Sequence, residues 1–267
     1  MTVSTTRNRR RLKQIGGKLL VLAFWLVLWQ LAAFLVNQEI LLVTPRQVAK
    51  TLLELFKNAD FWQTVAGSLL RILSGLGVGL AAGILLAVLT ANSRLVNYIF
   101  SLPLGIVKAT PVASFIILAL VWLNTDSVPI FCVALMVLPI VWSNLSRGIR
   151  EIDPQLREMA YVYRFPLWKK LYAVYFPQVL PYFMAALQTS IGFSWKSGIA
   201  AEVIALPKHS VGNMLYQAKI YLETPELFAW TAVVILLSVL LDKFLIMLLK
   251  KAGKRFRFLQ AGGEQND

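Results

Sequence analysis

Cysteine, histidine and charged residues are scarce in this sequence of 267 residues. The single cysteine, Cys132, excludes an internal disulfide and a cysteine-based zinc cluster, and His209 is the only histidine. A G-x-x-x-x-G-K-[ST] phosphate loop is also missing, so the chain is not expected to bind or hydrolyse ATP. We therefore expect a protein that is not an enzyme and that holds no metal and no cofactor of its own.

The composition is that of a membrane protein. Only 15% of the residues are charged and 58% are hydrophobic, with a mean hydropathy of +0.65, whereas about a quarter of the residues of a soluble domain are charged. Many apolar residues lie in runs close to the roughly 20 helical residues that cross a bilayer. In a soluble protein the net charge of +14 would suggest nucleic acid as a partner. Here we expect membrane lipid around the chain and no nucleic acid.

The apolar runs predict an all-α membrane protein with about six transmembrane helices. They cover residues 19–36, 68–91, 96–123, 128–145 and 179–206, with a last run ending near Lys250 and Lys251. The first run could be a signal peptide, but it exceeds the roughly 7 to 15 apolar residues of such signals and no small-x-small cleavage site follows. We therefore expect an uncleaved span. Residues 19–251 then form one transmembrane domain, with a core of about 60–250, between a basic N-terminus (1–18) and a tail (252–267).

Several features refine these spans. Residues 37–67 include an amphipathic segment, which predicts a surface helix outside the membrane. The second span carries glycines at spacings that let helices approach closely, namely Gly75, Gly77, Gly79 and Gly83. Pro103 and Pro111 predict a helix break within the third run. A polar loop is expected over residues 207–226.

The distribution of lysine and arginine predicts the orientation, because positively charged loops stay in the cytoplasm. With both termini inside, the inner segments hold 18 of the 27 basic residues and the outer segments hold five. Four others lie in or beside spans. This arrangement places both termini and the charged loop 147–178 in the cytoplasm.

The loop 147–178 reads as two short helices. Asp153 and Pro154 fit an N-cap followed by proline at the first helical position, Phe165 and Pro166 separate the two helices, and Pro177 is expected to end the second. Apolar side chains fall on one face of the segment: Leu156, Met159, Ala160, Tyr163 and Leu167. Apolar and charged groups together in the cytoplasm suit a protein partner. The alternative is an ordinary solvated connector.

This segment resembles the EAA loop of ABC importer permeases, whose pattern is E-A-A, three residues, G, nine residues and I-x-L-P. Glu158, Ala160, Val174, Phe176 and Pro177 match that spacing. Met159 departs from it at the second position and Arg164 at the glycine. Arg164 must therefore adopt a left-handed conformation or reshape the turn with help from Pro166.

The resemblance runs from about Thr44 to Lys251 and is strongest to permeases of the nitrate, sulfonate, taurine and bicarbonate type. Outside the loop it rests on Thr44-Pro45 with Trp62, on residues 68–71, on residues 111–113 leading to Trp122, and on Trp195 followed by Ala201-Glu202. It implies a type I (MetI-like) permease fold in the bacterial cytoplasmic (inner) membrane. It also implies a second permease chain, as a homodimer, together with cytoplasmic ATPase subunits that bind ATP and magnesium and an extracytoplasmic substrate-binding protein. The residues it assigns to ATPase coupling are Glu158, Met159, Ala160, Arg164, Phe165, Pro166 and Pro177.

Polar residues within the spans are candidates for the translocation path, because ionisable groups at membrane depth usually face a bundle interior or water. They are Lys108, Thr110, Pro111, Gln188, Ser194, Trp195, Lys196 and Glu202. Lys108 could attract an anionic substrate, or it could snorkel to the interface or pair internally. For Glu202 a structural hydrogen bond between helices is favoured over substrate binding.

Two other classes of function compete with an importer permease for a small anion. A secondary transporter would use intramembrane carboxylates and often shows inverted repeats, and Glu202 is its main candidate proton site. No internal repeat is evident in the sequence. A membrane-embedded enzyme is disfavoured because the spans lack clustered histidines, cysteines or paired carboxylates. The substrate itself is not specified, since related permeases also carry vitamin precursors and other organic solutes.

Overall fold

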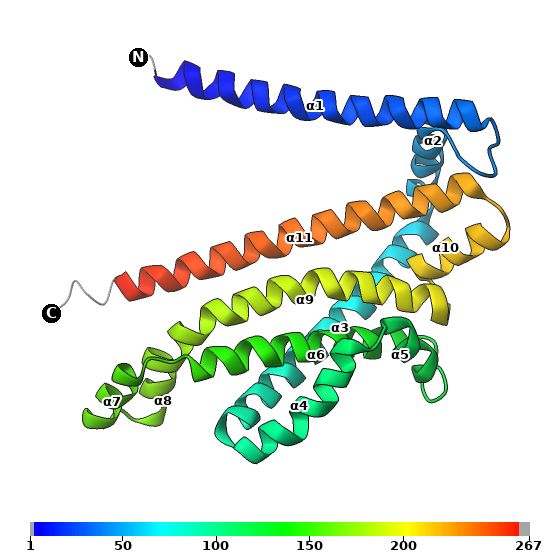
Figure 1. Cartoon of the computed structure of the whole chain (residues 1–267). Coiled ribbons are helices and arrows are strands. Elements are labelled where there is room, and N and C mark those ends of the chain that lie inside the picture. Colours follow the sequence, from blue (N-terminus) through cyan, green and yellow to red (C-terminus); the bar gives the residue numbers. More distant parts are fainter. Residues whose placement is uncertain (1–2, 262–267) are drawn as a thin grey trace. The chain divides into compact units, whose positions relative to one another are not determined.

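The computed structural model describes residues 3–261, and every regular element within this range is helical (Figure 1). The helices are α1 (Val3–Val36), α2 (Pro45–Phe56), α3 (Ala59–Asn92), α4 (Arg94–Ala109), α5 (Val112–Ala119), α6 (Ser127–Arg150), α7 (Pro154–Val162), α8 (Leu167–Lys170), α9 (Phe176–Ala205), α10 (Val211–Ile220) and α11 (Thr224–Ala261). A π-helical turn, η1 (Leu171–Tyr175), joins α8 to α9. The all-α class predicted from the sequence is confirmed.

The described chain divides into two compact units, the first of residues 3–61 and 214–233 and the second of residues 62–213 and 234–261. In the first unit, α2 begins with a capping box in which Gln47 N–H donates to Thr44 Oγ1 and Thr44 N–H donates to Gln47 Oε1. Its apolar side packs Val48 against Ala229 and Phe228. The predicted amphipathic helix is therefore present, and its position outside the membrane stays a prediction.

Glycines of α3 pack closely against valines of α6 in the second unit. They pair Gly75 with Val133, Gly79 with Val137 and Gly83 with Val141. A Cβ placed on any of these three glycines would lie 2.7 Å from the Cβ of its valine, which is too close for two carbon atoms. The predicted close approach is thus confirmed at three positions. Gly77 does not take part, since nothing lies within 4 Å of a Cβ placed there.

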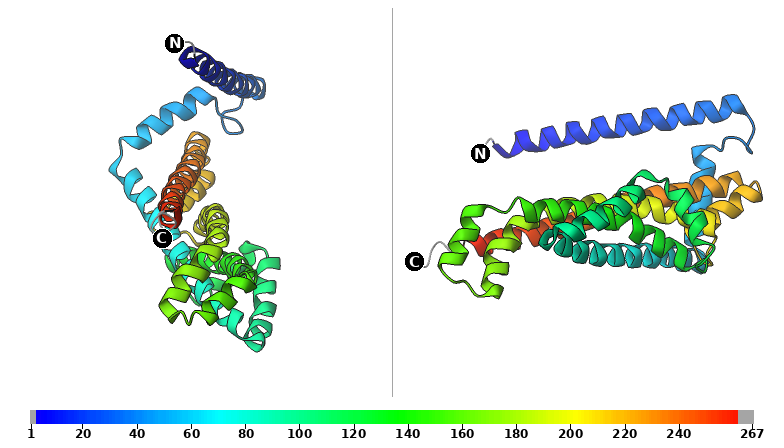
Figure 2. Two further views of the ribbon diagram at one scale, coloured as in Figure 1. Left: turned by 90° about the vertical axis from the view of Figure 1, so that its left-hand side faces the viewer. Right: turned by 60° about the horizontal axis from the view of Figure 1, so that its bottom comes forward.

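Helices α6 and α9 lie side by side (Figures 1 and 2). At one end, Gly148 of α6 lies against the ring of Tyr182, and the Tyr182 hydroxyl donates a hydrogen bond to Glu151. Further along, Gly198 of α9 lies against Ile72 of α3. The shared core of α3, α6 and α9 contains the buried residues Leu76, Ala87, Val133, Val137, Val141, Leu145, Ala186 and Ile191.

The third apolar run is broken, as its prolines predict. Helix α4 ends at Ala109 and α5 begins at Val112, with a bend of 103° between them. The break follows from Pro111, which disfavours a helical conformation at Thr110, and Thr110 is extended, with ψ at 133°. Pro103 lies inside α4 and does not interrupt it.

Among the described residues, α3, α6 and the Thr224–Phe244 part of α11 are long and apolar enough to cross a membrane, and α4 with α5 forms a fourth span if the bent pair is counted as one. The apolar part of α1 is shorter, from Leu20 to Val36. Helix α9 occupies the position of the predicted fifth span. The total of six spans and the cytoplasmic location of both termini stay predictions.

Two expected boundaries are wrong. The stretch predicted as a polar loop, residues 207–226, contains α10 and the start of α11. Pro177 does not end a helix, because α8, η1 and α9 are continuous and Pro177 lies in the first turn of α9. The π-helical turn explains this continuity, since Phe176 N–H reaches back five residues to Leu171 O and the widened turn accommodates the proline ring.

Candidate functional site

The loop between α6 and α9 folds into a short helical hairpin of α7 and α8. Helix α7 begins where the sequence predicts, with the Asp153 side chain accepting a hydrogen bond from Gln155 N–H at 2.8 Å and with Pro154 in the first turn. The backbone N–H of Asp153 donates a second hydrogen bond, to Gln178 Oε1 at 2.9 Å. This last contact ties the start of the hairpin to the start of α9.

Arg164 ends α7 in a left-handed conformation, with φ at 48°. Its N–H donates to Tyr161 O, and Phe165 N–H donates to Ala160 O, both at 3.0 Å. These two bonds form a Schellman motif, in which the left-handed position is usually glycine. Of the two possibilities that the sequence left for Arg164, the structure has the left-handed one.

A small apolar core lies inside the hairpin. Ile152, Ala160 and Val174 are buried, and Phe165 and Tyr175 pack against them. Ala160 therefore faces inward, although the sequence pattern grouped it with the exposed apolar residues. These contacts hold α7 against the π-helical turn η1 and against the ends of α6 and α9, while α8 contributes no buried residue.

The opposite side of the hairpin is exposed and unusually apolar. Tyr161 is 81% exposed and Trp168 is 80% exposed, and Glu158 and Pro166 are also at the surface. Six other large apolar or aromatic side chains of this segment are exposed: Leu156, Met159, Val162, Tyr163, Leu167 and Leu171. Exposed apolar groups gathered on one element mark an interaction surface more often than a solvated connector.

A second cluster of polar residues lies at the other end of the second unit, where α3, α9 and α10 meet. The Glu202 side chain is fully buried, and its Oε2 atom accepts hydrogen bonds from Ser68 Oγ at 2.7 Å and from Gly212 N–H at 3.2 Å. Ser68 Oγ in turn accepts from Val211 N–H at 2.9 Å. Ser68 and Glu202 thus satisfy the first N–H groups of α10, where the helix dipole also favours a negative charge.

Arg71 completes this cluster, which we call the α3–α9–α10 junction (Ser68, Arg71, Glu202, Val211 and Gly212). Its guanidinium donates to the carbonyl oxygens of Lys208 at 2.6 Å and His209 at 3.2 Å, and it pairs with Asp126 at 2.7 Å. Arg71 Nη1 lies 3.8 Å from Glu202 Oε1. The loop that Arg71 holds is strained, since Leu206 and His209 have positive φ values of 54° and 46°.

Sequence reasoning assigned no role to Ser68 or Arg71. Residues 68–71 were noted only for the family resemblance, because nothing in the local sequence indicates that Ser68 contacts Glu202, 134 residues away. The glycines offered a partial signal. A Cβ at Gly212 would lie 2.4 Å from Glu202 Cβ, and one at Gly67 would lie 2.5 Å from His209 O, so both positions require glycine.

The predicted path residues of α9 separate into two groups. Ser194 and Trp195 are buried and bonded within the second unit, Ser194 Oγ to Ser190 O at 2.6 Å and Trp195 Nε1 to Val234 O at 3.1 Å. Gln188 and Lys196 are exposed on a face of α9 that also includes Ala185, Thr189 and Phe193. These positions recur every three or four residues, so they form one stripe along the helix.

The candidates at the α4–α5 break also differ in their surroundings. Lys108 is exposed, with its Nζ atom 5.8 Å from the centroid of the Trp142 ring. Trp142 is held in place because its Nε1–H donates to Thr90 Oγ1 at 2.9 Å. Thr110 Oγ1 donates to Ile106 O within α4, and Pro111 is exposed. Among Lys108, Thr110 and Pro111, only Lys108 carries a charge, and its exposed amine lies near the Trp142 ring.

No group of three or more histidine, cysteine, aspartate or glutamate side chains among the described residues could hold a metal ion. Glu202 is the buried carboxylate of the junction. Its Oε2 atom accepts from a hydroxyl and a backbone amide, and its Oε1 atom lies 3.8 Å from the Arg71 guanidinium.

Residues 79–257 match the family model of the binding-protein-dependent transport system inner membrane component. Among curated relatives, the putative aliphatic sulfonates transport permease protein SsuC of Bacillus subtilis is 26% identical over 91% of this chain and 88% of its own length. The taurine transport system permease protein TauC of Escherichia coli is 25% identical over 88% and 86%. The bicarbonate transport system permease protein CmpB of Synechococcus elongatus is 25% identical over 88% and 90%.

A crystal structure of an amino acid ABC transporter with histidines contains a chain of the same fold. Its TM-score is 0.57 over 71% of this chain and 94% of its own length, with 17% sequence identity. At that identity the likeness extends to the fold only. The predicted permease fold is confirmed by this comparison together with the family match.

Proposed function

The chain belongs to the family of binding-protein-dependent transport system inner membrane components, and we propose that it forms the translocation path for a small anion and links that path to a separate ATPase through the hairpin of α7 and α8. As an ABC importer permease it is a transport component. The proposal has two parts, a coupling element at one end of the second unit and a transport face along α9.

The packing of the hairpin is the observation that carries the coupling proposal. Ile152, Ala160 and Val174 hold α7 against η1 and the ends of α6 and α9, and the outer side of the hairpin exposes Tyr161 and Trp168. A partner can exert force through an element only if the element does not deform under it. A buried core beneath an exposed apolar surface meets this requirement.

The continuity of α8, η1 and α9 supports transmission of movement from the hairpin. The helical segment runs without a gap from Leu167 to Ala205 and reaches the α3–α9–α10 junction at Glu202. A partner that displaces the hairpin would therefore move α9 as a lever against the junction. Such rigid-body movement of packed helices is a common way to convert closure at one site into opening at another.

The exposed stripe on α9 supports its role as the transport face. It presents the amide of Gln188, the hydroxyl of Thr189 and the amine of Lys196, which together suit a hydrated anion. Because this stripe has no covering element among the described residues of its own unit, we infer that it faces a path shared with a second permease chain.

The substrate class follows from the relatives and from the charge of the stripe. The relatives are named for transport of aliphatic sulfonates, taurine and bicarbonate, each of which carries an anionic oxygen group. Lys196 and Lys108 are exposed amines that would attract such a group. We therefore infer a small oxyanion or sulfonate, which an extracytoplasmic binding protein delivers.

A secondary transporter would instead need a carboxylate that gains and loses protons during transport. Glu202 is its main candidate, but Glu202 caps α10 together with Ser68 and lies beside Arg71. This arrangement supports a structural role for Glu202, and with it the ATP-driven function.

Co-purification with the ATPase subunit tests the proposal directly. Glu158→Lys reverses a charge at the exposed face of α7, and Glu54→Lys makes the same change on exposed α2 as a matched control. We expect Glu158→Lys to reduce both recovery of the ATPase and substrate-stimulated ATP hydrolysis, while Glu54→Lys leaves both unchanged. If Glu158→Lys assembles and hydrolyses ATP as the unaltered chain does, the coupling role of this face is wrong.

A further inference from the structure

An apolar cavity of about 700 Å³ opens beside the hairpin, between the end of α3, the end of α6 and the start of α9. Its size is within the range of roughly 300 to 1,000 Å³ that is usual for small-ligand pockets. None of the residues that line it carries a negative charge. Three of its lining residues, Leu167, Trp168 and Leu171, also belong to the exposed apolar side of the hairpin.

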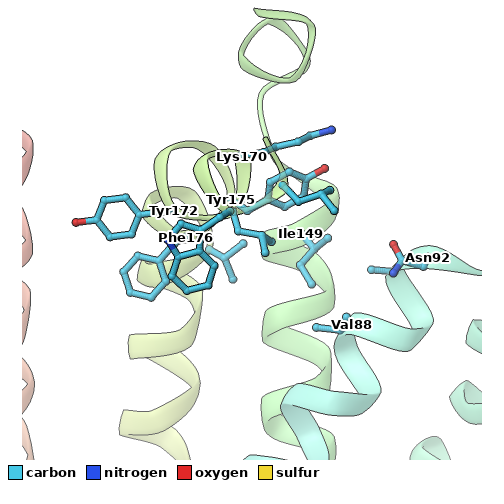
Figure 3. A pocket seen from close by; sticks show the side chains of 12 residues that line it. Val88, Asn92, Ile149, Lys170, Tyr172, Tyr175 and Phe176 are labelled. Carbon is cyan, nitrogen blue, oxygen red and sulfur yellow. The ribbon is translucent and has the colours of Figure 1, made fainter. Parts of the chain in front are cut away.

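The lining has the character of an amphiphile site. Figure 3 shows Val88 of α3, Ile149 of α6 and the ring of Tyr175 on one side, and Tyr172 and Phe176 on the other. The two most polar lining groups, Asn92 and Lys170, come from the ends of their helices. An apolar interior with an amide and an ammonium at its edge complements an acyl chain that carries an anionic head.

The π-helical turn is a second, independent feature of the same place. Three of its five residues, Leu171, Tyr172 and Tyr175, line the cavity. Such turns are rare and occur frequently at functional sites, because the extra residue per turn redirects side chains. Here the turn lets the helix pass Pro177, and it contributes Tyr172 and Tyr175 to the lining of the cavity.

We propose that this cavity binds an anionic phospholipid of the cytoplasmic leaflet, with its headgroup at Lys170 and an acyl chain between α3 and η1. The predicted orientation places this end at the cytoplasmic surface, where anionic lipids attract basic residues. Trp168, an amphipathic ring next to Lys169 and Lys170, is 80% exposed, as an aromatic anchor at the headgroup level would be before lipid binds. Charge complementarity favours an anionic lipid, because Lys170, the one charged residue in the lining, is positive.

Native mass spectrometry of the purified full-length chain tests this site, with phosphatidylglycerol and phosphatidylcholine as the two probes. We expect retention of phosphatidylglycerol in preference to phosphatidylcholine, and a rise in the thermal midpoint with phosphatidylglycerol alone. Lys170→Gln should weaken phosphatidylglycerol binding about fivefold, the usual contribution of one basic residue at a membrane surface. Lys169→Gln is the matched control, since Lys169 stacks on Phe165 at 4.5 Å and does not line the cavity.

A second variant separates the acyl part of the site from the headgroup. Ala91→Trp places an indole in the cavity and should abolish retention of both lipids while the chain still purifies as a folded protein. Equal retention of the two lipids, or full retention by both Lys170→Gln and Ala91→Trp, would overturn the proposal. Loss of the lipid on assembly with the ATPase would also overturn it and would assign the cavity to that protein.

Discussion

Arg164 is the residue at which this chain departs most clearly from the EAA pattern. Its backbone is left-handed, which costs a residue with a side chain about 1–2 kcal/mol relative to a right-handed conformation. The Schellman motif offsets this cost, because it satisfies the carbonyl groups of Ala160 and Tyr161 at the end of α7 and places Phe165 against the apolar core. The sequence predicted the position of this turn correctly and left its geometry open.

Replacement of Arg164 by glycine should stabilise the hairpin by about 1 kcal/mol, because glycine adopts the left-handed conformation without a steric penalty. Hydrogen exchange of the segment from Pro154 to Phe176 would measure this as slower opening of its amides. Arg164→Ala is the control, since it removes the same charge and keeps a Cβ. If Gly and Ala variants exchange at the same rate, the left-handed strain is not what limits the hairpin.

The buried carboxylate of Glu202 is expected to stabilise the α3–α9–α10 junction. Glu202→Leu removes the acceptor of Ser68 and Gly212 and leaves Arg71 without its nearest buried charge, so the unfolding free energy should fall by about 3 kcal/mol. Thermal unfolding in detergent would measure the change. Glu54→Leu on the surface of α2 should change the midpoint little, because exposed ion pairs contribute less than about 1 kcal/mol. A stable Glu202→Leu chain would show that the junction does not depend on the carboxylate.

The contact between α3 and α6 was predicted only in part from the sequence. The four-residue spacing of Gly75, Gly79 and Gly83 predicted a close helix contact, which the structure has. The spacing could not exclude Gly77, because the face that each glycine occupies depends on where the partner helix lies. Only the contact with the valines of α6 distinguishes the three packed glycines from the exposed one.

Gly79→Ala and Gly77→Ala should therefore have opposite effects. At position 79 the added methyl group meets Val137 and should destabilise the chain by about 1–3 kcal/mol, the usual cost of overpacking. At position 77 there is open space, and alanine should be neutral or slightly stabilising because it favours the helix. Thermal midpoints of the two purified variants would show this difference. Equal midpoints would mean that α3 and α6 are not packed as closely as described.

Two elements were not predictable in this way. Helix α10 lies where polar residues suggested a loop, because its first N–H groups are satisfied by Ser68 and Glu202, which are distant in sequence. The continuous segment through η1 was missed because Pro177 normally ends a helix, and nothing in the local pattern indicates a π-helical turn. In both cases a long-range contact or a rare turn overrides the local signal.

In the whole molecule, the proposed anion path depends on charge more than on shape. Lys196 is exposed on the α9 stripe, so Lys196→Ala should lower kcat/KM for uptake of an anion by about tenfold. The attraction between two opposite unit charges about 4 Å apart is roughly 1 kcal/mol in water and roughly 4 kcal/mol near a protein surface. Uptake of a sulfonate by membrane vesicles that contain the complete transporter would measure the effect.

Lys50→Ala on exposed α2 is the control for this uptake measurement, because it removes an amine of the same kind away from the stripe. Its uptake should equal that of the unaltered chain. If Lys196→Ala and Lys108→Ala both transport the anion at the original rate, the proposed anion path is wrong.

The central claim is that the exposed face of α7 contacts the ATPase. Cys132 is fully buried, so a cysteine introduced at Tyr161, which is 81% exposed, would be the reachable thiol among the described residues. A maleimide that carries a photoreactive benzophenone, attached to the introduced thiol and illuminated in the assembled complex, should link Tyr161→Cys to the ATPase subunit and should leave Lys50→Cys, on α2, unlinked. A transport-competent complex that gives no cross-link at position 161, or equal cross-linking from both positions, would contradict the account.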